Sequence, residues 1–114
     1  IVWGTGKPIR EWLYVEDGAE ALVRALEIES QIDPINVGVG QGVSITELAE
    51  IVKEIVGYQG KIVFDSSKPD GVPCKIQGSE RMEKVFNWIP PTDLREGIQK
   101  TVAWYENNVG QNNG

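Results

Sequence analysis

Three helix-start signals, each followed by an apolar stripe, constrain the fold of this chain more than any other feature. Each signal is a capping side chain with a glutamate three residues later: Asp17 with Glu20, Ser44 with Glu47, and Asp93 with Glu96. This arrangement satisfies backbone amides that the first turn of a helix leaves unpaired. Apolar residues then recur at spacings of three and four after each signal, which places them on one helical face. The sequence therefore predicts three amphipathic helices.

Short apolar runs between these helices predict strands. They lie at Ile1–Trp3, Trp12–Val15, Ile35–Val37 and Ile62–Phe64. Alternation of strand and helix is typical of an α/β fold, so we expect a small α/β domain of short, mostly parallel strands.

The remaining segments are predicted as follows. Gly57 is placed to end the second helix, and a short additional helix is expected at 79–85. The segment 65–78 has no periodicity and is expected to be a long loop, of the kind that is usually functional or disordered. We expect one domain over residues 1–106 and a polar, disordered tail over 107–114.

Composition excludes several classes of function. The net charge of −6 argues against nucleic acid as a partner. No apolar run approaches the roughly 18 residues that a membrane span needs, so no membrane partner is expected. The absence of histidine rules out a Ser-His-Asp nucleophile system and an ordinary zinc site. The single cysteine, Cys74, excludes an internal disulfide and fits a reducing compartment, so we expect a cytoplasmic location.

The segment from Trp3 to Arg10 is the first candidate site. Two glycines and a proline shape this loop, which carries an indole at one end and a guanidinium at the other. The indole face of Trp3 can stack on a ring, and the guanidinium of Arg10 can donate two hydrogen bonds to a phosphate. The alternative is a core tryptophan and an arginine in a surface ion pair.

The loop Lys68–Lys75 is the second candidate site. Two prolines stiffen it, and Asp70 and Lys75 could hold the hydroxyl and phosphate groups of a polar ligand. The alternative is a solvated turn. A third glycine-rich loop, Gly38–Gly42, invites a dinucleotide-binding interpretation, but its spacing departs from G-x-G-x-x-G, so a simple turn between strand and helix is favoured.

These segments resemble the extended short-chain dehydrogenase/reductase proteins of the NAD(P)-dependent epimerase/dehydratase family. Trp3–Asp17 resembles their WGxGxPxREFLYVDD segment, and Ile35–Gly38 with Ser44–Ala49 resembles NVGxGxxxTIxELA. Ile62–Gly71 resembles VFDxSKPDG, and Leu94–Ile98 resembles SLREGL; both are features of the GDP-L-fucose synthase branch. The resemblance covers nearly the whole chain and implies the C-terminal, substrate-binding half of such an enzyme.

The resemblance implies that Trp3, Arg10, Asp70 and Lys75 bind a nucleotide sugar, in particular a GDP-linked deoxyhexose. Two departures weaken it: Cys74 stands where the family usually has arginine, and Gly78 stands where it usually has a helix-capping aspartate. Ser79 could take over that cap.

The family's NADP site and its catalytic Ser and Tyr-x-x-x-Lys belong to an N-terminal Rossmann half. No tyrosine of this chain has lysine four residues later, so we expect no catalytic residue and no bound cofactor here, with NADP used by the full-length family. The expected partner is a Rossmann half. Two alternatives stay open: a stand-alone binding or assembly module in which a second copy covers the apolar face, and an unrelated small α/β domain.

Overall fold

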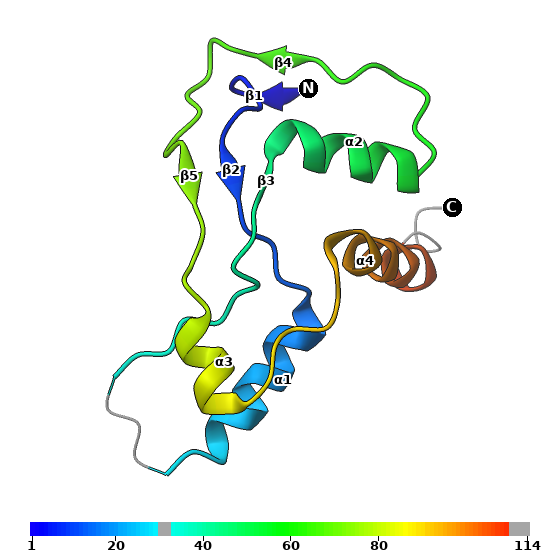
Figure 1. The fold of residues 1–114 in the computed structure, drawn as a ribbon. Helices are drawn as coiled ribbons and strands as arrows, with labels where there is room; N and C mark the ends of the chain where they lie inside the picture. The colour runs from blue at the N-terminus through cyan, green and yellow to red at the C-terminus, as the bar shows by residue number, and fades with distance from the viewer. Residues whose placement is uncertain (30–32, 110–114) are drawn as a thin grey trace.

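The structure, a computed structural model, describes residues 1–29 and 33–109. Five two-residue strands and four helices follow one another along this part of the chain (Figure 1). Their order is β1 (Val2–Trp3), β2 (Ile9–Arg10), α1 (Val15–Leu26), β3 (Val43–Ser44), α2 (Ile45–Ile55), β4 (Phe64–Asp65), β5 (Cys74–Lys75), α3 (Glu80–Phe86) and α4 (Leu94–Asn108).

The strands form two small sheets. β1 pairs with β4 in parallel, with Val2 opposite Phe64. β2 is the central strand of the second sheet, parallel to β5 on one side and antiparallel to β3 on the other. The strands are therefore short and mostly parallel, and the predicted α/β class is confirmed.

Two of the three predicted helix-start signals form as expected. The Oγ of Ser44 accepts a hydrogen bond from the amide of Glu47 at 3.1 Å, and Oδ1 of Asp93 accepts one from the amide of Glu96 at 2.8 Å. Gly57, with φ +66°, follows the end of α2 as predicted. The short helix α3 is also present, one residue later than expected.

The prediction that Asp17 caps the first helix is wrong. α1 begins at Val15, its N-cap is Tyr14, and Asp17 lies inside the first turn. Asp17 is buried, and its carboxylate accepts hydrogen bonds from the amide and the hydroxyl of Thr92, both at 3.0 Å. A short carboxylate near a helix start can serve either the local amides or a distant segment, and here the distant segment binds it.

The strand predicted at Trp12–Val15 is wrong as well. Trp12–Tyr14 connect β2 to α1. Together with Val15, the first residue of α1, they line an apolar pocket of about 470 Å³ against side chains of α2 and α4. The strand predicted at Ile35–Val37 is also absent; Ile35 and Val37 pack instead against the core beside α1 and α3. At Ile35–Val37, packing against the core rather than sheet pairing uses the apolar side chains, whereas Trp12 and Val15 stay partly exposed beside the pocket.

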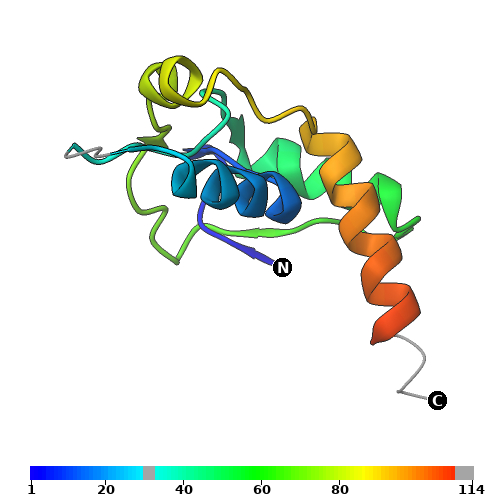
Figure 2. The same ribbon diagram turned by 90° about the horizontal axis from the view of Figure 1, so that it is seen from below.

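The core of the described chain is small. Its buried apolar residues are Ala21, Met82 and Phe86, from α1 and α3. The radius of gyration is 16.9 Å, compared with about 13 Å for a compact domain of this length. In Figure 2, α4 extends away from the other elements. The shape therefore leaves much apolar surface uncovered.

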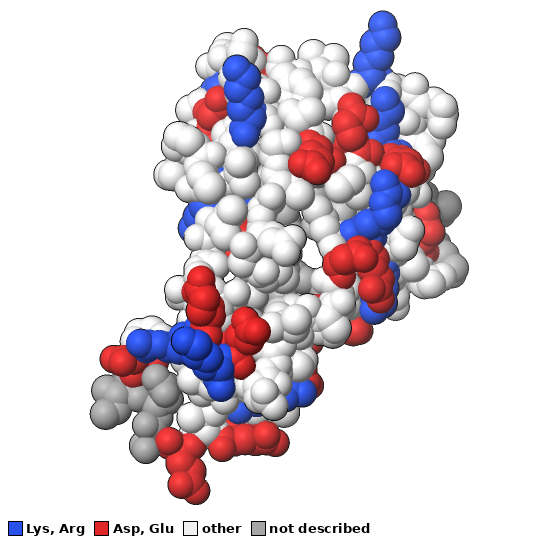
Figure 3. Space-filling model, viewed as in Figure 1, with Lys and Arg blue, Asp and Glu red and all other residues white. Residues whose placement is uncertain are grey.

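The predicted apolar stripe of α1 faces outward. The side of α1 that carries Asp17 and Ala21 is buried, whereas Leu22 is 69% and Leu26 is 86% exposed. Val15 and Val23 are exposed too. Wide uncharged areas also separate the charged groups on the face in Figure 3. An outward apolar stripe on a helix indicates a surface that another body covers.

The helix α4 reaches Asn108, so the first residues of the predicted tail are helical. Residues 110–114 of that tail lie outside the described residues.

Candidate functional site

The loop between β1 and β2, which contains Gly4 and Gly6, is held by hydrogen bonds from the start of α2. The carbonyl oxygen of Gly6 accepts hydrogen bonds from the amide of Thr46 at 2.9 Å and from its Oγ1 at 3.0 Å. The carbonyl oxygen of Pro8 accepts one from the amide of Ile45 at 3.1 Å. Gly6 has φ +76°, a conformation that glycine adopts without strain. Glycine is favoured at this position because the backbone has a positive φ and packs closely against the start of α2.

Asp70 links the two candidate loops, Trp3–Arg10 and Lys68–Lys75. Its Oδ1 accepts a hydrogen bond from the amide of Thr5 at 2.6 Å, and its Oδ2 accepts one from the hydroxyl of Thr5 at 2.7 Å. These bonds, with the nearby charges of Lys7 and Arg10, hold the pKa of Asp70 below its ordinary value. The predicted ligand-binding role of Asp70 stays a prediction, since the contacts of its carboxylate in the structure are to Thr5.

The bond between Thr5 and Asp70 should be lost in acid. A carboxyl whose pKa is lowered on folding stabilises the fold above its unfolded pKa, and that contribution disappears as the pH falls through the folded pKa. We expect the Thr5 amide resonance in an NMR titration to shift with a midpoint below the ordinary Asp value of 3.8. In Asp70→Asn this transition should be absent. A midpoint at or above 3.8 in the unmodified chain would contradict the assignment.

Arg10 and Lys75 are neighbours on adjacent strands. They stand opposite each other in the parallel pair of β2 and β5, so both side chains leave the same face of the sheet. Lys68 places its ammonium 5.5 Å from the ring centre of Trp3, near enough for a cation–π contact. The structure thus assembles the predicted residues Trp3, Arg10, Asp70 and Lys75 on two adjoining segments, within an otherwise acidic chain.

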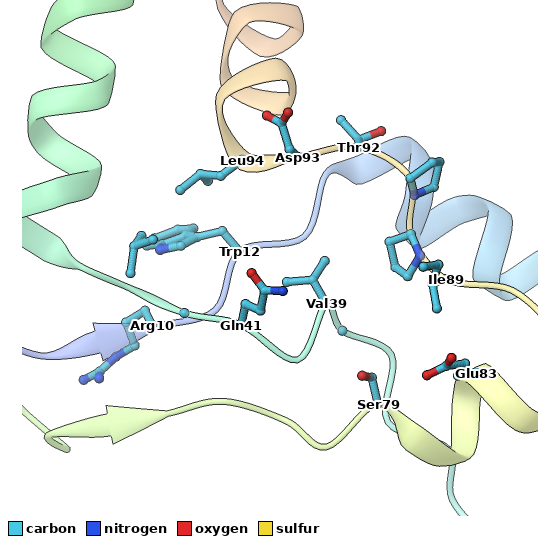
Figure 4. A pocket seen from close by; sticks show the side chains of 15 residues that line it. Arg10, Trp12, Val39, Gln41, Ser79, Glu83, Ile89, Thr92, Asp93 and Leu94 are labelled. Carbon is cyan, nitrogen blue, oxygen red and sulfur yellow. The ribbon is translucent and has the colours of Figure 1, made fainter.

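A pocket of about 460 Å³ opens beside Arg10 (Figure 4). Side chains from four parts of the chain line it: the end of β2, the loop before β3, the start of α3 and the connection between α3 and α4. Trp12, Gln41, Glu83 and Leu94 contribute to its walls. Among the described residues, Trp3, Asp70 and Lys75 lie outside it. Arg10 therefore connects the pocket with the two loops.

Glu11 is a structural residue of this region that sequence reasoning missed. Its Oε1 accepts hydrogen bonds from the amides of Val39 and Gly40, at 2.5 and 2.6 Å. Its Oε2 accepts one from the amide of Gln77 at 2.7 Å. An acidic residue directly after Arg10, in a chain with a Gly-x-Gly loop, was the available signal. Two amides of the loop Gly38–Gly42, the glycine loop, therefore already donate to a carboxylate of the protein.

Known proteins are similar to this chain over almost its whole length. The family model for NAD dependent epimerase/dehydratase proteins matches residues 1–38. "Probable GDP-L-fucose synthase 1" of Oryza sativa subsp. japonica is 49% identical over 109 residues, covering 96% of this chain and 33% of that protein. GDP-L-fucose synthase of Escherichia coli is 37% identical, covering 95% of this chain and 36% of that protein.

The fold agrees with these relatives. A crystal structure of a GDP-L-fucose synthetase from Naegleria fowleri bound to NADP matches with a TM-score of 0.89 and 30% identity, over 96% of this chain and 35% of that one. The chain belongs to the NAD-dependent epimerase/dehydratase family. It corresponds to a C-terminal part of an extended short-chain dehydrogenase/reductase. It spans about a third of the length of the curated relatives that it matches.

Two of the similar solved structures hold a nicotinamide cofactor: the Naegleria fowleri structure is bound to NADP, and a Bacillus anthracis dTDP-glucose 4,6-dehydratase is in complex with NAD. The described residues of this chain do not fit a dinucleotide at their glycine loop. Glu11 already accepts from the amides of Val39 and Gly40, which a bound phosphate would need. No step of a reaction is therefore assigned to a cofactor held by this loop.

The two departures from the family pattern have structural outcomes. Cys74 lies exposed on β5, opposite Ile9. Ser79 occupies the N-cap position of α3, but its side chain makes no capping hydrogen bond, so Ser79 does not take over that cap.

In the part of the chain that the structure describes, no cluster of three acidic, cysteine or histidine residues could hold a metal ion. Within the same residues, no helix has the length and apolar character that a bilayer crossing requires.

Proposed function

We propose that this chain supplies the nucleotide-sugar-binding part of an epimerase/reductase similar to GDP-L-fucose synthase, with a GDP-linked deoxyhexose as its ligand. The observation that carries the proposal is the union of the two candidate loops. Asp70 bonds Thr5, and β2 pairs with β5, so that Arg10 stands beside Lys75. Segments about 65 residues apart in the sequence thus lie side by side, and we propose that their cationic and aromatic side chains form one binding surface.

This surface matches the chemistry of a nucleotide diphosphate. Arg10 and Lys75 would bind the two phosphates, because a guanidinium donates in a fixed fork and an ammonium adds a point charge. Trp3 would provide a face for a ring, with Lys68 beside it. Asp70 lies at the same end and would hold hydroxyl or amino groups of the nucleotide. The pocket beside Arg10 offers space for further parts of the ligand.

Recognition rather than catalysis is the proposed contribution of this chain. It has no histidine and no Tyr-x-x-x-Lys pair, so the proton transfers of epimerisation and reduction need groups from elsewhere. We propose that a Rossmann half with an NADP site is the partner. The outward stripe on α1 and the small core support this partner, because both leave apolar surface for another body to cover.

Replacing Arg10 with alanine should weaken the binding of GDP to this chain by about tenfold, because a charge-assisted bond to phosphate is lost. Isothermal titration calorimetry with GDP and with GDP-mannose would measure this effect. Arg95→Ala is the matched control, because Arg95 pairs with Glu54 between α2 and α4, away from the loops. Equal affinities for all three proteins would count against the proposal.

A second candidate function is a non-catalytic binding or assembly module in which two copies cover each other's apolar face. The exposure of Leu22 and Leu26 on α1 supports it as well. Light scattering coupled to size-exclusion chromatography separates the two. A dimer that Leu22→Glu dissociates favours the module, whereas a monomer that binds a separately produced Rossmann half favours the enzyme part.

A further inference from the structure

Glu11 is the residue in which three segments of the candidate site meet. It follows Arg10 directly, and its backbone amide donates to the carbonyl oxygen of Lys75 at 3.3 Å, which continues the pairing of β2 with β5. Its carboxylate accepts hydrogen bonds from Val39, 28 residues away, and from Gln77, 66 residues away. One side chain thus ties the glycine loop and the end of β5 to β2.

The glycine loop is shaped to admit this carboxylate. A Cβ atom on Gly38 would lie 2.9 Å from the carboxyl carbon of Glu11 and closer still to Oε1. Gly40, whose amide also donates to Glu11, has φ +69°. Side chains at these positions would push the loop away from the carboxylate or strain the backbone. The two glycines therefore have a steric role in this contact.

The hydrogen bonds of Glu11 involve segments that lie next to Arg10 and Lys75, the residues that we assign to phosphate binding. Gly38 and Val39 line the pocket together with Arg10. Gln77 follows β5, whose Lys75 stands opposite Arg10. Hydrogen bonds from amides to a charged carboxylate are shorter and roughly twice as strong as neutral ones, so they hold geometry well.

From this arrangement we propose that Glu11 is a positioning residue for nucleotide diphosphate recognition. It fixes the pocket wall at Gly38 and Val39 and keeps β5 in register with β2, so that Arg10 and Lys75 act on one diphosphate. Glu11 itself does not touch the ligand. This inference rests on the proposed function for its consequence, but its structural content can be measured without any ligand.

The test uses Glu11→Gln, which keeps the size of the side chain. A glutamine has one oxygen and one NH₂ group, so it cannot accept from all three amides, and one side of the contact must break. In the free chain we expect the NMR amide resonances of Val39, Gly40 or Gln77 to shift. We also expect GDP affinity to fall by about fivefold, while guanosine affinity stays unchanged because it lacks phosphates. Glu106→Gln, an exposed acid on α4, is the matched control.

The outcomes separate this inference from the proposed function. Unchanged amide resonances in Glu11→Gln, or an equal loss of GDP and guanosine affinity, would overturn the positioning role. If the unmodified chain does not bind GDP, the proposed function fails, while shifted amide resonances still support the structural contact. Gly38→Ala provides a second route, because it displaces the loop without removing the charge. It should reproduce the selective loss of GDP affinity, and thermal unfolding of each variant confirms that the chain remains folded.

Discussion

Gly6→Ala should lower the free energy of unfolding by about 2 to 5 kcal/mol, because two costs add at this position. The backbone of Gly6 has φ +76°, where a Cβ atom is strained by about 1–2 kcal/mol. The new Cβ would also lie 2.9 Å from Cδ1 of Phe64 and closer to Cε1 and to the Thr46 hydroxyl. Phe64 and Thr46 would have to shift to make room, so we expect overpacking to add about 1–3 kcal/mol. Urea unfolding followed by circular dichroism measures the sum.

Gly57→Ala is the matched control for this effect. Gly57 has φ +66°, similar to Gly6, but a Cβ placed there meets no atom within 4 Å. It should cost only the backbone strain, about 1–2 kcal/mol. An equal loss of stability in the two variants would contradict the close contact between Gly6 and Phe64.

Asp17→Ala should destabilise the fold by about 2 to 3 kcal/mol. Its buried carboxylate accepts from both the amide and the hydroxyl of Thr92, so removing it leaves two donors without their acceptor. The loss also removes a negative charge from the first turn of α1, where the helix dipole favours one. Chemical unfolding of the variant measures this loss, and Asp17→Asn, which retains one acceptor oxygen, should lose about half as much.

Two comparisons make this prediction specific to the Thr92 contact. Glu16→Ala removes an exposed acid from the same helical turn and should change stability by no more than about 0.5 kcal/mol. In a double-mutant cycle, Asp17→Ala and Thr92→Val should be non-additive, because both remove the bond between the carboxylate and the hydroxyl. Additive effects would mean that Asp17 stabilises the fold through contacts other than its bond with the Thr92 hydroxyl.

Predictions from local patterns succeeded where the contacts are local. The caps of α2 and α4 need a side chain and an amide three residues apart, so Ser44 and Asp93 could be identified from spacing alone. Asp17 carried the same pattern but bonds Thr92, 75 residues away, which no local signal reveals. The strands β2, β3 and β5 were missed for the same reason. Each has two residues, and their pairing joins Ile9 to Ser44 and to Cys74.

By itself, the sequence determined the helices, the α/β class and the residues of the two candidate loops, because these depend on side-chain period, caps and short motifs. The tertiary structure alone decided how the loops meet. It joined Thr5 to Asp70, placed Arg10 beside Lys75, and gave Glu11 its three amide donors. It also decided that the apolar stripe of α1 faces outward. The physical reason is that a period predicts which residues share a face, whereas only long-range packing determines what that face contacts.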